Sequence, residues 1–242
     1  MTLIRKIALF CAVITLFNCS GLLKKDKTPK ETLVEITTDF GNMLIELSDK
    51  TPKHKTNFIK LAKEGYYDSL LFHRVMQNFM VQGGDPKSKT AAAGVQLGNG
   101  GPGYTVPMEL DSSLYHKKGA LSAARLPDNM NPTKASSGSQ FYIVQGRKFD
   151  VKQLKNMERG KQRSNPNFSY SQEQLTDYST LGGYPPLDGE YTVFGQVIKG
   201  LEVIDAIAKV RVDRANRPLS NVRMTMKVIE VSPKEKLKLL DQ

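Results

Sequence analysis

Residues 72–85 place one arginine among large apolar side chains. This segment carries the side chains in the sequence that are best suited to form a binding or catalytic site. It reads FHRVMQNFMVQGGD. A charged Arg74 between apolar residues must either extend to water or hold a partner, and Gln82 has the amide donors and acceptors to brace a guanidinium. Gly83 and Gly84 then allow a sharp turn after a strand. The pattern predicts a binding surface, although a plain strand with one surface arginine has the same pattern.

Three further blocks follow in order along the chain. They are LSAA at residues 121–124, SGSQFYIV at residues 137–144 and LDGEYTVFG at residues 187–195. Together with residues 72–85, they resemble the signature of the cyclophilins, which are peptidyl-prolyl cis-trans isomerases. The resemblance covers residues 33–231. It implies isomerase activity without a cofactor, and proline-containing polypeptides as partners.

The resemblance also implies roles for individual residues. Arg74 and Gln82 would be catalytic, with the glutamine holding the arginine. The substrate-binding residues would be Phe79, Met80, Ala124, Arg125, Gln140, Tyr142, Leu187 and Tyr191. Backbone groups near Ala124 and Arg125 would pair with the peptide. Any one of the apolar positions, taken alone, is equally well explained as plain core.

Four positions depart from the best-known cyclophilins. Tyr142 stands where phenylalanine is usual, which adds a hydroxyl at the wall of the pocket. Arg125 replaces a common asparagine and adds positive charge at the edge of the pocket. Tyr191 takes the place of a frequent histidine, and Pro186 stands where many members have tryptophan. None of these changes removes Arg74, so we expect catalysis to survive them.

The implied chemistry suits an arginine. Rotation about an amide bond moves no proton, but resonance gives it a barrier of roughly 18 to 20 kcal/mol. A catalyst must bind the twisted amide better than either planar form. Twisting localises the lone pair on the prolyl nitrogen, and the permanently charged guanidinium of Arg74 can donate to it. One charge-assisted hydrogen bond supplies about 1.5 to 3 kcal/mol, or about one to two orders of magnitude in rate.

The elements that must position these residues are short strands. Residues 33–37 and 42–47 alternate apolar and polar side chains, which predicts an antiparallel hairpin. Helices are expected at residues 51–64 and 201–208, and a closing strand at 222–231. Two helices and many short strands favour a mainly β fold, a closed antiparallel eight-stranded β-barrel capped by two α-helices.

The isomerase domain is expected to span residues 33–232, with an insertion at 147–186 and a C-terminal tail at 233–242. The insertion is polar and has a helix-like stretch at residues 171–178. It either lengthens the substrate groove or binds a partner, or it is a tolerated surface excursion.

Composition limits the alternatives. The chain has 242 residues, a net charge of +11 and 39% hydrophobic residues, so it can bury a core of its own. Its lysines are scattered, which favours a solvated basic surface over nucleic-acid binding. His54, His73 and His116 are isolated and show no metal-ligand spacing. We therefore expect no metal, no cofactor and no nucleic acid, and we expect a monomer.

The N-terminus is typical of a targeting segment. Arg5 and Lys6 precede a short apolar run at residues 7–17, and Cys19 follows. This arrangement resembles a bacterial lipoprotein signal, which implies a signal peptide at residues 1–18, lipid on Cys19 and a tether at 19–32. The protein would be anchored to a membrane of the bacterial cell envelope on its extracytoplasmic side. Because Asn18 stands where a small residue is usual, a plain signal peptide or an uncleaved anchor remains an alternative.

A second class of function also remains open. The same fold could grip proline-containing segments as a chaperone or scaffold, with turnover incidental. Arg74, Gln82, Phe79 and Gln140 favour the enzyme, whereas the basic surface and the insertion are compatible with the binding module.

Overall fold

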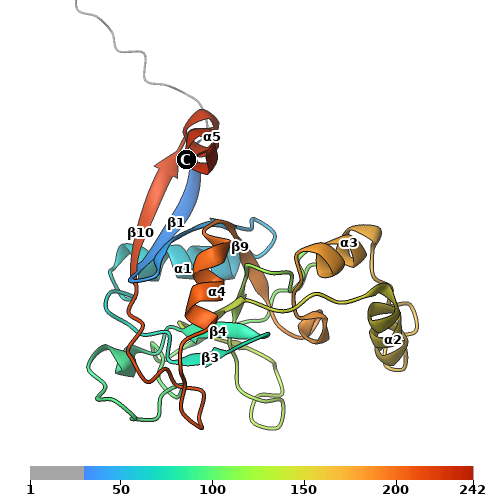
Figure 1. The fold of residues 1–242 in the computed structure, drawn as a ribbon, viewed down its shortest axis with the longest axis horizontal. Coiled ribbons are helices and arrows are strands. Elements are labelled where there is room, and N and C mark those ends of the chain that lie inside the picture. Colours follow the sequence, from blue (N-terminus) through green and yellow to red (C-terminus); the bar gives the residue numbers. More distant parts are fainter. Residues whose placement is uncertain (1–29, 242) are drawn as a thin grey trace, which may run out of the picture.

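The computed structural model describes residues 30–241, which form one large antiparallel sheet with helices packed around it (Figure 1). The predicted signal peptide, Cys19 and most of the predicted tether lie outside the described residues. Within residues 30–241, no helix is long and apolar enough to cross a membrane.

Eight strands make up the large sheet, and all of its pairings are antiparallel. This confirms the prediction of a mainly β fold. The order across the sheet is β10 (Thr225–Val231), β1 (Glu31–Thr38), β2 (Gly41–Leu47), β9 (Val193–Lys199), β6 (Ala120–Ala123), β8 (Phe141–Val144), β4 (Met80–Gly83) and β3 (Arg74–Met76). Two short strands, β5 (Thr105–Val106) and β7 (Ser136–Ser137), form a separate small sheet.

The two outermost strands, β3 and β10, are not paired with each other in the ladder. Backbone hydrogen bonds instead join the segments that precede them. The Ser69 nitrogen donates to the Met224 oxygen and the Phe72 nitrogen to the Val222 oxygen, each at 2.9 Å. Closure of the sheet into a barrel therefore stays a prediction.

The first hairpin forms where its alternating pattern predicts it. Gly41 has a φ of +121°, a conformation that L side chains rarely adopt, and it permits the tight turn between β1 and β2. Strand β1 begins at Glu31, two residues before the expected start of the domain. Glu31 pairs with Val231 and Thr32 with Glu230, so the end of the predicted tether lies in the sheet.

Helices α1 (Pro52–Lys63) and α4 (Leu201–Ala208) occupy the two predicted positions. Each buries one apolar face in the main core, where Phe58 of α1 meets Phe141 and Phe194 edge-to-face. Residues 30–241 also contain helices besides these two capping helices. These are α2 (Val151–Gln162), α3 (Gln172–Thr180), α5 (Pro233–Asp241) and the 3-10 turns η1 (Pro86–Lys89) and η2 (Pro185–Leu187).

The insertion is a folded unit that lies beside the sheet (Figure 1). Its two helices each begin with a capping box, Asp150 with Gln153 in α2 and Ser171 with Gln174 in α3. A small second core joins it to the domain: Phe149, Leu154, Tyr170 and Tyr178 of the insertion pack with Tyr115 of a preceding loop. Helix α3 contains the predicted helix-like stretch at residues 171–178 except for its first residue, which caps the helix.

Candidate functional site

The hairpin of β3 and β4 sets Arg74 opposite Gln82 in the strand register. Neighbouring side chains on one face of an antiparallel pair are close enough to bond. The guanidinium Nη1 donates to Gln82 Oε1 at 3.1 Å, and Nη2 lies 3.1 Å from the sulfur of Met76. The other N–H groups of this half-buried arginine have no hydrogen-bond partner within residues 30–241, so they can donate to a substrate.

Gln140 continues this hydrogen-bonded chain from the next strand. Gln82 Nε2 donates to Gln140 Oε1 at 3.1 Å, and Gln140 Nε2 donates to the carbonyls of Gly98 and Gly100 at 2.8 and 2.7 Å. The buried carboxylate of Asp85 accepts from the nitrogens of the same two glycines. Both glutamine amides are therefore oriented, and they hold Arg74 in one place.

A glycine after β4 makes this close approach possible. Gly84 has a φ of +91°, and a side chain there would collide with the carbonyl of Ser139. The expected sharp turn is therefore confirmed, and it brings the strand of Gln82 against the residues that precede Gln140.

An apolar cluster adjoins the arginine through Met76. The structure brings together all of the predicted apolar pocket residues in this cluster. Met80 and Tyr142 are buried, while partly exposed side chains form the rest of the surface. The partly exposed members include Phe79, Ala124, Leu187 and Tyr191.

The hydroxyl of Tyr142 bonds to a buried histidine. His116 Nε2 lies 2.9 Å from this hydroxyl, and the two rings stack with an interplanar angle of 12°. His116 Nδ1 is 3.0 Å from Asp188 Oδ1, and the Tyr178 hydroxyl donates to Asp188 Oδ2 at 2.6 Å. Burial raises the pKa of Tyr142 well above its ordinary value, so the hydroxyl stays protonated. This network links the pocket wall to the insertion and gives His116 two side-chain partners.

Arg125 lies at the edge of the pocket, as predicted, but its positive charge is paired with neighbouring groups. Its side chain is only 4% exposed, and its guanidinium lies 4.3 Å from the centre of the Tyr191 ring. It also bonds to the carboxylate of Asp128 and to the Glu190 carbonyl. The arginine therefore fixes the edge of the pocket by stacking and pairing.

Only one of the two predicted backbone sites is free to pair with a peptide. The nitrogen of Ala124 donates to the Gln140 oxygen, and the oxygen of Ala124 accepts from the Ser137 nitrogen. Within residues 30–241, the backbone groups of Arg125 have no such partners. Beside them a groove of about 780 Å³ runs past Gln82 and Gln140.

Sequence reasoning missed Tyr184, at the end of the insertion. Its ring packs on Phe79 with 4.2 Å between ring centres, and its nitrogen donates to the His116 oxygen. No motif marks this residue, because its position depends on how the insertion returns to the domain. Tyr184 adds an aromatic wall next to the predicted pocket.

The surroundings of Arg74 contain neither a charged histidine nor a metal centre in the described part of the chain. His73, next to Arg74, is buried, and this burial is the main cause that lowers its pKa to about 4. It is neutral at physiological pH. Residues 30–241 contain no cluster of three or more His, Cys, Asp or Glu that could hold a metal ion. The arrangement can bind an apolar ring and donate hydrogen bonds from a fixed cation.

Known proteins share this arrangement of sequence and fold. The chain matches the family described as cyclophilin type peptidyl-prolyl cis-trans isomerase/CLD over residues 33–228. A Staphylococcus epidermidis protein named as a peptidyl-prolyl cis-trans isomerase is 34% identical over 201 residues, 83% of this chain and 92% of that protein. A Streptococcus pyogenes protein named as a bifunctional phosphatase/peptidyl-prolyl cis-trans isomerase is 38% identical over 192 residues. That match covers 78% of this chain but only 37% of the streptococcal protein.

A solved structure has a similar fold. The crystal structure of a Cryptosporidium parvum cyclophilin type peptidyl-prolyl cis-trans isomerase, in the presence of the dipeptide Ala-Pro, aligns with a TM-score of 0.55. The two chains are 25% identical, and the alignment covers 83% of this chain and 99% of the other.

Proposed function

Because the chain belongs to the cyclophilin-type peptidyl-prolyl cis-trans isomerases and is such an enzyme, we propose that Arg74 and the apolar cluster beside it form its catalytic site. The observation that carries this proposal is the hydrogen-bonded chain from Arg74 through Gln82 to Gln140. It fixes a cation with unused N–H groups next to a partly exposed apolar surface.

Each part of the site has a role in amide rotation. The proline ring packs against Phe79, Met80, Tyr142 and Leu187, which holds one side of the amide in place. Arg74 donates to the prolyl nitrogen as its lone pair localises, so it binds the twisted amide better than the planar one. The backbone of Arg125 pairs with the peptide and holds the other side.

The substrates we propose are proline-containing polypeptides. Two observations support this: the Cryptosporidium parvum relative was crystallised with Ala-Pro, and a groove continues beside Gln82 and Gln140. No step of this mechanism calls for a cofactor, because amide rotation transfers neither protons nor electrons.

We also propose that the sheet closes into the eight-stranded barrel of the family. The hydrogen bonds between residues 69–72 and 222–224 support this, because they join the two outer edges of the sheet. The protein would act as a monomer.

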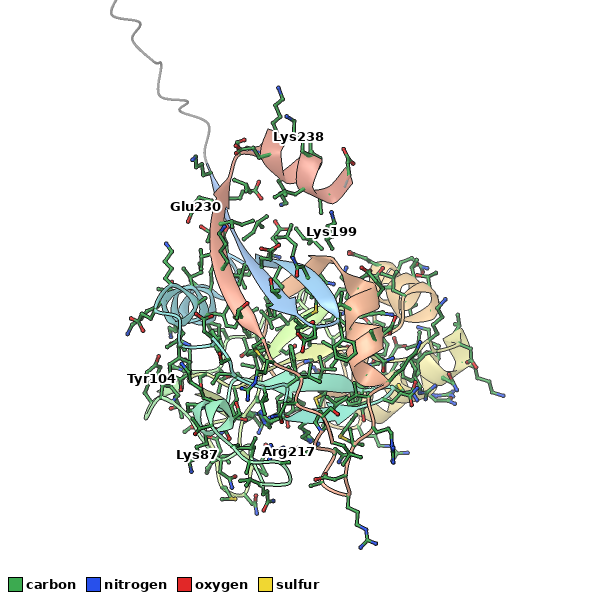
Figure 2. The ribbon with its side chains drawn as sticks, turned by 60° about the vertical axis from the view of Figure 1, so that its left-hand side comes forward. Lys87, Tyr104, Lys199, Arg217, Glu230 and Lys238 are labelled. Atoms are coloured by element: carbon green, nitrogen blue, oxygen red, sulfur yellow. The ribbon has the colours of Figure 1, made fainter. Side chains whose placement is uncertain are left out.

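We further propose that the enzyme acts outside the cytoplasm, held to a bacterial membrane by lipid on Cys19. The sequence of residues 1–19 supports this proposal. The described chain starts at the end of the ribbon formed by β1 and β10, next to α5, where Figure 2 labels Lys238. Strands β3 and β4 lie in the body of the molecule, away from the tip of this ribbon (Figure 1), which supports a tether that leaves the pocket open.

The test compares turnover with binding. The purified protein is added to a short X-Pro peptide, and cis-to-trans exchange is followed together with binding of the same peptide. The proposed site predicts accelerated exchange, and proline analogues that fill the pocket should inhibit it. Measurable binding without acceleration would instead identify a binding module.

A further inference from the structure

A second groove, of about 510 Å³, lies between the insertion and the body of the domain. The insertion contributes residues 165–174 to its lining. The loop at residues 109–115 and the segment at residues 188–193 provide the rest. The groove therefore exists only because the insertion is folded next to these two loops.

This groove shares lining residues with the apolar cluster of the proposed proline pocket. Val193 lines the groove and packs in the same apolar cluster as Met80 and Tyr142. Tyr191 also lines it, and its ring centre is 6.1 Å from that of Tyr142. Since an extended chain advances about 3.3 to 3.6 Å per residue, a peptide with its proline against Tyr142 reaches the groove within about two residues.

The lining carries polar groups that are free to bind a polypeptide. The side-chain amides of Asn165 and Asn167 make no hydrogen bond within residues 30–241, and both lie in the groove. Amides can donate to and accept from a peptide backbone. Leu110, which is 49% exposed, adds an apolar surface beside them.

The lining is also acidic, in a protein whose net charge is +11. It contains Glu109, Asp111 and Asp188 and no lysine, arginine or histidine. Two lysines border it: Lys50 lies 3.4 Å from Asp111 and is mostly exposed, and Lys161 donates to the backbone oxygen of Asp188. The three carboxylates outnumber the two lysines, but Asp188 is buried with His116 Nδ1 3.0 Å away, so the negative charge that a peptide meets comes mainly from Asp111, whose side chain is 32% exposed.

The partner of Glu109 does not cancel its charge. His54 Nδ1 lies 2.7 Å from Glu109 Oε2, but burial is the main cause that lowers the pKa of His54. The histidine is therefore neutral at pH 7, and Glu109 keeps its negative charge.

We propose that this groove binds the polypeptide segment next to the isomerised proline, and that it favours lysine or arginine over aspartate or glutamate in that segment. The insertion is then part of the substrate site, which it extends beyond the proline pocket. This inference rests on the proposed function of the pocket, since the groove acts on a chain already held there.

The test uses two lengths of peptide and one charge change. A tetrapeptide with a central X-Pro bond is too short to enter the groove, so its turnover measures the proline pocket alone. Peptides of about ten residues carry lysine or glutamate two to three residues from the proline, far enough to enter the groove. The purified full-length chain in detergent is assayed for kcat/KM on each peptide, and fluorescence anisotropy gives the Kd of the long peptides.

The decisive variant is Asp111→Lys, and the matched control is Asp39→Lys. Both replace a carboxylate in a loop, but Asp39 lies in the exposed turn between β1 and β2. For the wild type we expect kcat/KM about two- to fivefold higher with lysine peptides than with glutamate peptides, the size of an exposed charge interaction. Asp111→Lys should abolish or reverse this preference, and Asp39→Lys should keep it.

The outcomes separate the groove from the pocket. If lysine and glutamate peptides have equal kcat/KM and equal Kd while the tetrapeptide is turned over normally, the proposal for the groove is overturned. The proposed function of the pocket then stays intact. A preference that persists in Asp111→Lys also overturns it. If no peptide is turned over, the proposed function fails, and the Kd values alone then decide whether the groove selects basic segments.

Discussion

The substitution Tyr142→Phe separates the ring of this residue from its hydroxyl. The ring belongs to the apolar cluster proposed to hold proline, whereas the hydroxyl lies 2.9 Å from the buried His116. We expect the variant to lose stability and to keep its activity, because phenylalanine preserves the surface that the substrate meets.

The loss of stability has two parts. The hydrogen bond itself contributes about 1 kcal/mol, and leaving the buried Nε2 of His116 unpaired costs about 1 to 3 kcal/mol more. The two parts together, about 2 to 4 kcal/mol, correspond to a fall in Tm of about 4 to 16 °C for a domain of this size. The change in kcat/KM should stay within about twofold, less than 0.5 kcal/mol of transition-state stabilisation.

Thermal unfolding and the peptide isomerisation assay test this prediction together. Tyr170→Phe is the matched control, because the buried hydroxyl of Tyr170 has no hydrogen-bond partner within residues 30–241. Its removal should leave Tm unchanged or raise it. A tenfold fall in kcat/KM for Tyr142→Phe, at unchanged Tm, would refute the reasoning and make the hydroxyl a substrate contact.

Three further predictions concern the surroundings of the site. Gln140→Leu removes the amide that links Gln82 to Gly98 and Gly100, so Arg74 is held less firmly. The kcat/KM of this variant on a short X-Pro peptide should fall by about tenfold. Tyr184→Ala exposes one side of the pocket, and KM should rise by about threefold to tenfold with little change in kcat. The third is that proton binding by the unfolded chain at His73 should lower the stability of the fold by about 3 kcal/mol as the pH falls from 6.5 to about 4.

The sign of the pH effect follows from proton binding. The folded pKa of His73 lies below its unfolded value, so in this window the unfolded chain binds a proton that the folded chain does not. Chemical denaturation at several pH values measures the loss, and it should shrink in His73→Gln. If the free energy of unfolding of His73→Gln depends on pH as steeply as that of the wild type, the loss does not come from His73.

For Gln140→Leu and Tyr184→Ala, wild-type kinetics in a stably folded variant would contradict the roles given to these side chains.

The sequence predicted the parts of the fold whose patterns are local. The alternation at residues 33–47 and the helical spacing at 51–64 depend on neighbours in the chain, and both elements form there. The Arg74–Gln82 pair was also predictable, because a short hairpin fixes which residues face each other. Closure of the barrel depends on contacts between distant segments, and no local pattern specifies them.

The surroundings of the pocket could not be predicted for the same reason. The Tyr142 hydroxyl, His116 and Tyr178 come from three separate segments that meet only when the insertion folds against the domain. The burial of Arg125 depends on Tyr191 and Asp128, which are on two different loops. Residue type alone indicated a positive charge at the pocket edge and a hydroxyl at the pocket wall, but not the tertiary partners that occupy both groups.

The most direct test of the central claim is the isomerisation rate of a short X-Pro peptide with Arg74→Ala, against the wild type and Gln77→Ala. Gln77 is an exposed residue in the same hairpin turn and serves as the control. The loss of a charge-assisted hydrogen bond of about 1.5 to 3 kcal/mol should lower kcat/KM by about ten- to a hundredfold in Arg74→Ala. Gln77→Ala should match the wild type. An Arg74→Ala enzyme as fast as the wild type would contradict the account, because the twisted amide would then be stabilised by other groups.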